Sequence, residues 1–198
     1  MKIYGDRRSG NCYKLQLVCS LLDIPHEWID IDIMAGATRG EAFTALNPNQ
    51  KIPLLELDDG RCLAESNAIL NYLALGSHLE PSDDFARARV LQWQFFEQYS
   101  HEPYIAVARF IALYQGLPEE RRTEYEAKQA GGLKALDVME QQLSETTYLV
   151  GDKLTTADVS LYAYTHVAHE GGFDLAGFSA ISRWLRRIES EPGYIALG

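Results

Sequence analysis

A hydroxyl and an amide occur together where the first predicted strand gives way to the first predicted helix. They belong to the run Ser9-Gly10-Asn11-Cys12. A serine hydroxyl at a helix tip can donate a hydrogen bond to a thiolate, and hydrogen bonding to the charged form lowers the pKa of a thiol. Asn11 offers an amide donor at the same tip, which could replace the Ser9 hydroxyl in this role or assist it. The alternative is that Ser9 and Asn11 merely cap the helix.

Cys12 has two possible roles. A thiol in the first turn of a helix can be acidified, and it could then form a mixed disulfide with a thiol cofactor. The alternative is a small buried side chain that packs against the sheet. Cys19 and Cys62 look structural, and three scattered cysteines do not resemble a secreted disulfide scaffold.

A proline opens an apolar strand at Ile52-Pro53. Proline removes a donor from the strand ladder and is unusual in that place. The sequence therefore predicts a cis bond between Ile52 and Pro53, with the backbone of Ile52 turned outward to bind an extended ligand. Gln50 and Lys51 come just before it and could reach a carboxylate, although a lysine in a loop is most often only solvated.

A further helix is predicted to begin at Glu65-Ser66. Its free N–H groups and positive dipole end favour an anion. Ser66 could take a carboxylate while Glu65 pairs with an ammonium group, or the two could form an ordinary helix cap. Together with Ser9 and Ile52, these residues could hold a small thiol peptide that has a free carboxylate.

The first 76 residues alternate between strand and helix patterns. Strands are predicted at 2–5, 26–33, 54–57 and 61–63, and helices at 11–22, at 39–46 and after residue 65. Residues 58–60 read Asp-Asp-Gly, which is typical of a hairpin turn. The order β-α-β-α-β-β-α is that of a thioredoxin-like unit.

The rest of the chain carries helix patterns only. Helices are predicted at 86–115, from Pro118, at 155–170 and at 179–189. Pro103 should kink or break the first of them, and Thr155 with Asp158 forms a capping-box pattern. The predicted fold is α/β plus all-α: a thioredoxin-like domain over 1–76, a linker at 77–84 and an all-helical domain over 85–198.

The composition excludes some classes of function. The formal net charge is −10, which argues against nucleic acid as a partner because phosphate binding needs a basic patch. No apolar run approaches the length of a membrane span, and the first residues lead straight into strand sequence without a signal-peptide pattern. We expect a cytoplasmic protein without a membrane partner and without a metal.

Four runs of sequence resemble the glutathione S-transferase family, in particular its bacterial members. They are Ser9 to Lys14, Asn47 to Pro53, Glu65 to Leu70 and Gly151 to Asp158, in this order and over essentially the whole length. The resemblance implies that glutathione is a co-substrate. Its cysteinyl backbone would bind at Ile52-Pro53 and its γ-glutamyl end at Glu65-Ser66, while Gln50 or Lys51 would approach the glycyl carboxylate.

The resemblance also bears on how the thiol is activated. Ser9 matches the activating serine of serine-type members, and Asn11 matches the asparagine of some bacterial members that reduce disulfides. Tyrosine-type members place their tyrosine late in the first strand, where this chain has Gly5, so Tyr4 is out of register. Cys12 lies deeper in the helix than the cysteine of cysteine-type members.

The resemblance implies a glutathione transferase that acts in detoxification on hydrophobic electrophiles. The second substrate would lie between the domains, with Tyr104, Val107 and Phe110 as candidate walls, and the family is usually dimeric. One alternative is a glutathione-dependent disulfide reductase or peroxidase that uses Asn11, or Cys12. Another is a non-enzymatic binding or stress-response protein with the same fold.

Overall fold

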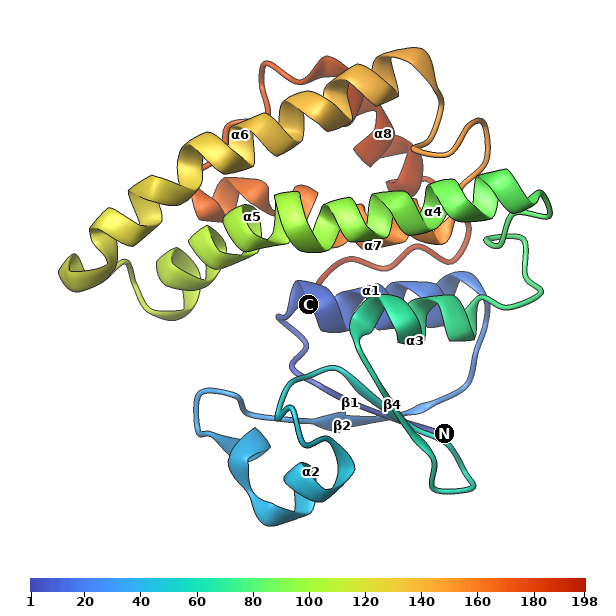
Figure 1. Cartoon of the computed structure of the whole chain (residues 1–198), viewed down its shortest axis with the longest axis vertical. Coiled ribbons are helices and arrows are strands. Elements are labelled where there is room, and N and C mark those ends of the chain that lie inside the picture. The colour runs from blue at the N-terminus through green and yellow to red at the C-terminus, as the bar shows by residue number, and fades with distance from the viewer. The chain divides into compact units, whose positions relative to one another are not determined.

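The computed structural model describes all residues from 1 to 198, and the chain divides into two compact units. The first unit contains residues 1–77 and 191–198, and the second contains residues 78–190 (Figure 1). None of the helices combines the length and the apolar character needed to cross a membrane.

A four-stranded sheet forms the base of the first unit, in the strand order β2-β1-β3-β4. Its strands are β1 (Lys2–Gly5), β2 (Glu27–Asp30), β3 (Leu54–Glu56) and β4 (Cys62–Ala64). β1 runs parallel to β2 and antiparallel to β3, and β3 pairs antiparallel with β4. The predicted strand order along the chain is confirmed, although β2 is shorter than the 26–33 pattern suggested.

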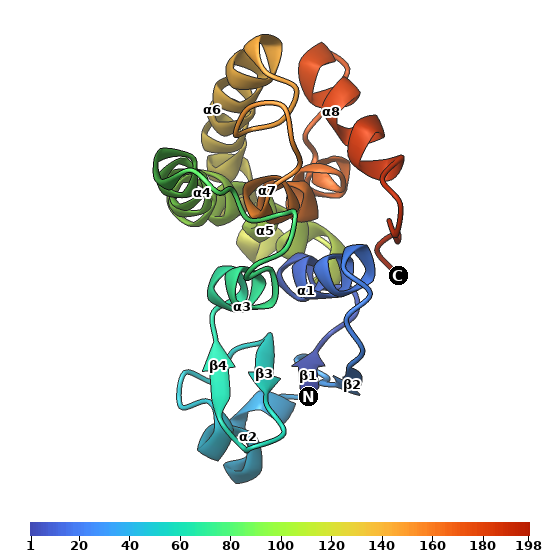
Figure 2. The same ribbon diagram turned by 90° about the vertical axis from the view of Figure 1, so that its right-hand side faces the viewer.

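Two helices cover one side of this sheet, α1 (Gly10–Leu21) and α3 (Ser66–Leu73), and the short α2 (Glu41–Leu46) lies on the other (Figure 2). A 3-10 turn at Ala37–Arg39 precedes α2. Residues 12–15 and 17–19 of α1 are all buried. These features confirm a thioredoxin-like unit in which most of α1 is enclosed.

The last eight residues pack on the first unit. The hydroxyl of Tyr13 donates to the carbonyl oxygen of Ile195 at 2.6 Å. Gly193 has φ +83°, and a Cβ there would lie 2.8 Å from the carbonyl oxygen of Ser20. Sequence alone does not separate these residues from the helical region, because they carry no helix or strand pattern of their own.

The second unit is all helical, as predicted. Its α-helices are α4 (Asp84–Phe96), α5 (Glu102–Arg109), α6 (Arg122–Glu145), α7 (Thr156–Thr165) and α8 (Ser179–Glu189). π-helical segments follow α4 at Glu97–His101 and α5 at Phe110–Tyr114, and 3-10 turns occur at Glu119–Arg121 and Ala168–Gly171.

Prolines shape the helical unit in two places. Pro103 lies in the first turn of α5, directly after the π-helical segment, so the expected break is a change of helix type rather than an end. Pro118 precedes a 3-10 turn, and α6 begins only at Arg122. The long helix therefore begins about one turn later than the predicted start at Pro118. The helix predicted over 155–170 ends at Thr165.

Candidate functional site

Ser9 stands at the tip of α1 in an extended conformation, with φ −75° and ψ 125°. Its Oγ accepts a hydrogen bond from the backbone N–H of Cys12 at 3.4 Å. A hydroxyl that accepts in this way still has its own hydrogen to donate. Ser9 therefore caps the helix and also keeps a donor at the helix N-terminus, so the two interpretations of this residue are compatible.

The thiol of Cys12 is a packing group. Its side chain is fully buried, and a Cβ on Gly5 would lie 2.8 Å from its Sγ. Burial raises the pKa of Cys12 to about 12, against smaller lowering effects of hydrogen bonds from Ser9 and Asp6. A raised thiol pKa favours the packing role of Cys12 over its use as a redox thiolate.

The other cysteines and Tyr4 offer no activated group. Burial raises the pKa of Cys19 to about 12 and also raises the pKa of the exposed Cys62. The hydroxyl of Tyr4 donates to Glu56 Oε2 at 2.5 Å, and chiefly this bond raises the pKa of Tyr4 to about 12. The phenol is occupied by Glu56, in agreement with its position out of register.

The start of α3 is held next to the start of α1. Glu65 caps α3 with φ 69°, a left-handed conformation that a glutamate adopts at a cost of order 1–3 kcal/mol. Its side chain is exposed, whereas the next residue, Ser66, is buried. The hydroxyl of Ser66 donates to Asn11 Oδ1 at 3.1 Å. The structure thus joins two of the predicted site residues that are 55 positions apart.

Lys14 completes this arrangement, and the sequence analysis assigned it no role. Its side chain is fully buried, and Nζ donates to Ser66 Oγ at 3.2 Å. An ammonium group has no lone pair, so the hydrogen of Ser66 has to point elsewhere, to Asn11 Oδ1 or to a ligand oxygen. Lys14 therefore makes the Ser66 hydroxyl a donor. Because Ser66 donates to Oδ1 of Asn11, the Nδ2 of that amide points away from Ser66.

The loop before β3 is fixed by a second residue that sequence reasoning did not single out. Buried Asn47 donates through Nδ2 to the carbonyl oxygen of Lys51 at 2.8 Å, and its Oδ1 accepts from Asn49 N–H at 3.1 Å. The sequence signal that could have singled out Asn47 is the turn pattern Asn-Pro-Asn-Gln at 47–50, because asparagine side chains often bridge a turn by hydrogen bonds to its backbone. The side chain of Lys51 remains exposed.

The bond between Ile52 and Pro53 is cis, as predicted. Leu54, the first residue of β3, pairs with Tyr4 on one side and with Ala64 on the other. This register brings Pro53, the end of β1 and the start of α3 to the same edge of the sheet. Gln50, with φ 56°, is exposed nearby and donates to Thr44 Oγ1 at 3.3 Å.

The candidate substrate-wall residues lie in the helical unit on α5 and its π-helical continuation, and all are half-buried. Tyr104 packs on Gly131 of α6, because a Cβ at Gly131 would lie 2.2 Å from the ring. Phe110 stacks on Tyr114 with ring centroids 5.1 Å apart. Both aromatic rings thus contribute to packing within the unit, and the role of Tyr104, Val107 and Phe110 as substrate walls stays a prediction.

Residues 8–75 match the family model of the glutathione S-transferase N-terminal domain, and residues 90–192 match that of the C-terminal domain. The chain belongs to the glutathione S-transferase family. Within the family, its bacterial subtype is a prediction from the sequence.

Solved and curated glutathione S-transferases resemble the chain along its length. A glutathione S-transferase from Pseudomonas fluorescens Pf-5 is 62% identical with a TM-score of 0.98, and the match covers 99% of this chain and 98% of that chain. Glutathione S-transferase 2 of Anopheles gambiae is 32% identical, over 93% of this chain and 88% of the relative. The glutathione transferase URE2P6 from Phanerochaete chrysosporium, solved with oxidised glutathione, is 25% identical with a TM-score of 0.87, covering 97% and 91%.

Proposed function

We propose that this glutathione S-transferase binds reduced glutathione in its first unit and directs the thiolate at hydrophobic electrophiles. The observation that carries the proposal is the Ser9 hydroxyl, which keeps a hydrogen to donate at the N-terminus of a twelve-residue helix. A donor and a helix dipole at one point both stabilise an anion more than a neutral thiol. Ser9 is the residue to which we assign thiol activation.

The remaining site residues supply contacts to each part of the tripeptide. Lys14 makes the Ser66 hydroxyl a donor, and on binding this hydrogen can move from Asn11 Oδ1 to the carboxylate of the γ-glutamyl end, while the exposed Glu65 suits its ammonium group. The backbone of Ile52, before cis Pro53, suits the extended cysteinyl unit. Gln50 and Lys51 are exposed at the surface, where they can approach the glycyl carboxylate.

Calorimetry and ultraviolet titration test the proposal together. We expect reduced glutathione to bind with measurable heat, and the bound thiol to develop thiolate absorbance near 240 nm at a lower pH than free glutathione. Turnover of 1-chloro-2,4-dinitrobenzene should follow the same titration. Absence of binding heat would refute the proposal, and binding without turnover of any electrophile or disulfide would assign a non-enzymatic role instead.

A glutathione-dependent disulfide reductase or peroxidase is the second candidate. The residue that favours it is Asn11 in the first turn of α1, because its side-chain amide is a second donor type beside Ser9 at this helix tip and its Oδ1 accepts from Ser66 at 3.1 Å. The relative URE2P6 was solved with oxidised glutathione, which is the product of such a reaction. Reduction of 2-hydroxyethyl disulfide that depends on Asn11 and survives Ser9→Ala would select this candidate. We assign Cys12 no part in it, because its side chain is buried and burial raises the pKa of its thiol to about 12.

Lys14→Met is expected to weaken glutathione binding by about tenfold, the effect of one lost charge-assisted contact. The methionine keeps the length of the side chain but cannot donate to Ser66, whose hydroxyl is then free to turn away from the ligand. Calorimetry measures the loss, after circular dichroism has shown that the variant is folded. Lys14→Arg retains a donor and should recover part of the affinity. Equal affinity of Lys14→Met and the parent would show that Ser66 needs no such orientation.

We also propose a homodimer built on an apolar face of the second unit. Leu91, Phe95 and Tyr99 follow each other at four-residue spacing on α4 and its π-helical continuation, with Phe95 65% and Tyr99 82% exposed. Large apolar side chains grouped in this way mark an interaction surface. Light scattering should give twice the chain mass of 22.3 kDa for the parent, and the mass of one chain for Phe95→Glu. The control Met34→Glu, at another exposed apolar residue, should stay dimeric, and a monomeric parent would contradict the proposal.

A further inference from the structure

The loop between α2 and β3 is tied to the rest of the first unit by Asn47. This residue directly follows α2, and its backbone N–H donates to the carbonyl oxygen of Phe43 at 2.9 Å. Phe43 is itself buried, and its ring centroid lies 6.3 Å from that of Tyr4 on β1. Asn47 is therefore anchored to the sheet through α2, and only 5% of the residue is exposed.

The two ends of the Asn47 amide form different hydrogen bonds, which fixes the orientation of the side chain. Nδ2 donates to the carbonyl oxygen of Lys51 at 2.8 Å, and Oδ1 accepts from the N–H of Asn49 at 3.1 Å. If the amide were turned by 180°, its N–H₂ would face the N–H of Asn49 and its oxygen would face the carbonyl of Lys51, so both bonds would be lost. The Asn47 side chain therefore holds the Lys51 carbonyl in one direction.

The direction of the Lys51 carbonyl determines the direction of the next N–H. The cis bond of this loop is the one between Ile52 and Pro53, so the peptide between Lys51 and Ile52 is trans. In a trans peptide the C=O and the N–H lie in one plane and point in opposite directions. Because the Lys51 carbonyl points to Asn47, the Ile52 N–H points away from it. That N–H donates to no atom of the chain, so it is available to a ligand.

We propose that Asn47 is a positioning residue for glutathione, which fixes the Ile52 N–H as a donor to the carbonyl oxygen of the cysteinyl unit. This inference rests on the proposed function, in which the Ile52 backbone binds that unit. A donor whose direction is set before the ligand arrives needs little ordering on binding. Asn47 thus contributes to the affinity for thiols that carry a carbonyl group next to the cysteinyl Cα, and it acts through Ile52 rather than by contact with the ligand.

Calorimetry of the full chain with three reduced thiols tests this role. Glutathione and γ-glutamylcysteine both have an oxygen on the cysteinyl carbonyl carbon, whereas γ-glutamylcysteamine lacks that carbon. We expect Asn47→Ala to bind glutathione and γ-glutamylcysteine about three- to tenfold more weakly than the parent does, and to bind γ-glutamylcysteamine with unchanged affinity. Asn49→Ala is the matched control, because Asn49 lies in the same turn with an exposed side chain, and only its backbone N–H takes part in these bonds. It should bind all three thiols like the parent.

A second variant separates the bond to Lys51 from the shape of the turn. Asn47→Asp keeps an oxygen for the Asn49 N–H but has no N–H₂ for the Lys51 carbonyl. We expect the same selective loss of affinity for glutathione and γ-glutamylcysteine, after circular dichroism has shown that the variant is folded. If Asn47→Ala does not fold, Asn47→Asp decides the question.

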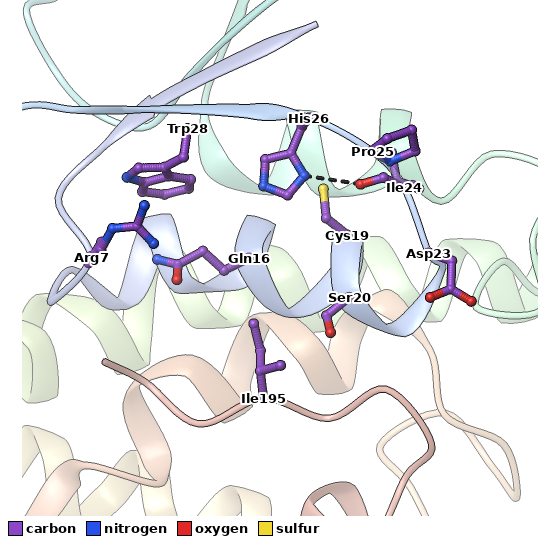
Figure 3. Close-up of a pocket in the computed structure, with 10 residues that line it drawn as sticks. All are labelled: Arg7, Gln16, Cys19, Ser20, Asp23, Ile24, Pro25, His26, Trp28 and Ile195. Atoms are coloured by element: carbon purple, nitrogen blue, oxygen red, sulfur yellow. Dashed lines mark hydrogen bonds between the residues drawn. The ribbon is translucent and has the colours of Figure 1, made fainter.

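The first unit also contains a cavity of about 440 Å³ beside β2, with Arg7, Trp28 and Ile195 among its lining residues (Figure 3). No residue of the loop from 47 to 53 lines this cavity. A thiol that bound there would not respond to either Asn47 variant. The comparison of the variants with the parent therefore also distinguishes binding at Ile52 from binding beside β2.

Three results would overturn the proposed role of Asn47 and leave the transferase function intact. The first is equal affinity of the parent and both Asn47 variants for glutathione. The second is an equal loss of affinity for all three thiols, which would indicate a general disturbance of the unit. The third is a loss confined to glutathione, which would show that Asn47 acts at the glycyl end through Gln50 or Lys51. Absence of glutathione binding to the parent would instead refute the proposed function, and the role of Asn47 with it.

Discussion

Replacing Ser9 by alanine is expected to raise the pKa of the bound glutathione thiol by about one to two units. A hydrogen bond to a charged group contributes about 1.5–3 kcal/mol, and one pKa unit corresponds to about 1.4 kcal/mol. Ser9 is the hydroxyl at the tip of α1, and its Oγ already accepts from the backbone N–H of Cys12, so its hydrogen is the one available to the sulfur. The helix dipole remains in the variant, which is why the shift should be partial.

The loss of Ser9 should slow conjugation, because only the thiolate form of bound glutathione attacks an electrophile. Ser9 favours the thiolate, so its loss leaves more of the bound thiol protonated at any pH below the new pKa. Conjugation should fall by about ten- to a hundredfold at pH values well below the thiol pKa of the parent, where the thiolate fraction changes tenfold per pKa unit, and by less near neutral pH. The deficit should shrink as the pH rises and vanish above the raised pKa. Thiolate absorbance near 240 nm and the pH dependence of turnover measure the shift independently.

Two companion variants make this result specific. Ser9→Thr keeps a hydroxyl and should keep most of the lowered thiol pKa. Asn11→Ala removes the other donor at the helix tip, whose Oδ1 is occupied by Ser66. If Ser9→Ala left the thiol pKa and the pH profile unchanged while Asn11→Ala shifted them, Asn11 would be the residue that activates the thiol. This result would favour the disulfide-reductase function.

The start of the site could be predicted from the sequence because its signals are local. Ser9 directly precedes the apolar helix pattern, and the structure uses it as the cap of α1. Thr155 and Asp158 have the spacing of a capping box, and both of its hydrogen bonds are present. The helix predicted at 179–189 has these bounds in the structure. Each of these features depends on residues within one or two turns of the chain.

Lys14 could not be predicted because its role is set by a residue far along the chain. A lysine near a helix start is normally solvated, and burial of Lys14 is explained only when α3 places Ser66 beside it. The one local sign is its position three residues after Asn11, on the same side of the helix. The same limit applies to Tyr104, whose packing depends on the absence of a side chain at Gly131.

Asp158→Asn is expected to lower the stability of the second unit by about 3 kcal/mol, because it removes two buried hydrogen bonds and sets donors against donors. The carboxylate of Asp158 is fully buried and accepts four hydrogen bonds. Oδ1 accepts from Leu149 N–H and from Trp184 Nε1, both at 2.9 Å. Oδ2 accepts from Thr155 N–H at 2.9 Å and from Thr155 Oγ1 at 3.0 Å. Whichever way the amide is turned, its N–H₂ replaces an oxygen that served two donors.

Thermal unfolding followed by circular dichroism should show a midpoint lower by about 6 to 12 °C, since 1 kcal/mol corresponds to about 2–4 °C for a chain of this size. The matched control is Asp152→Asn, the same chemical change at an exposed residue whose carboxylate accepts one bond from Thr147 Oγ1 at 3.2 Å. Its midpoint should stay close to that of the parent. Equal midpoints for Asp158→Asn and Asp152→Asn would mean that water replaces the missing acceptor at Asp158. The links from α7 to α8 and to Leu149 would then contribute little to stability.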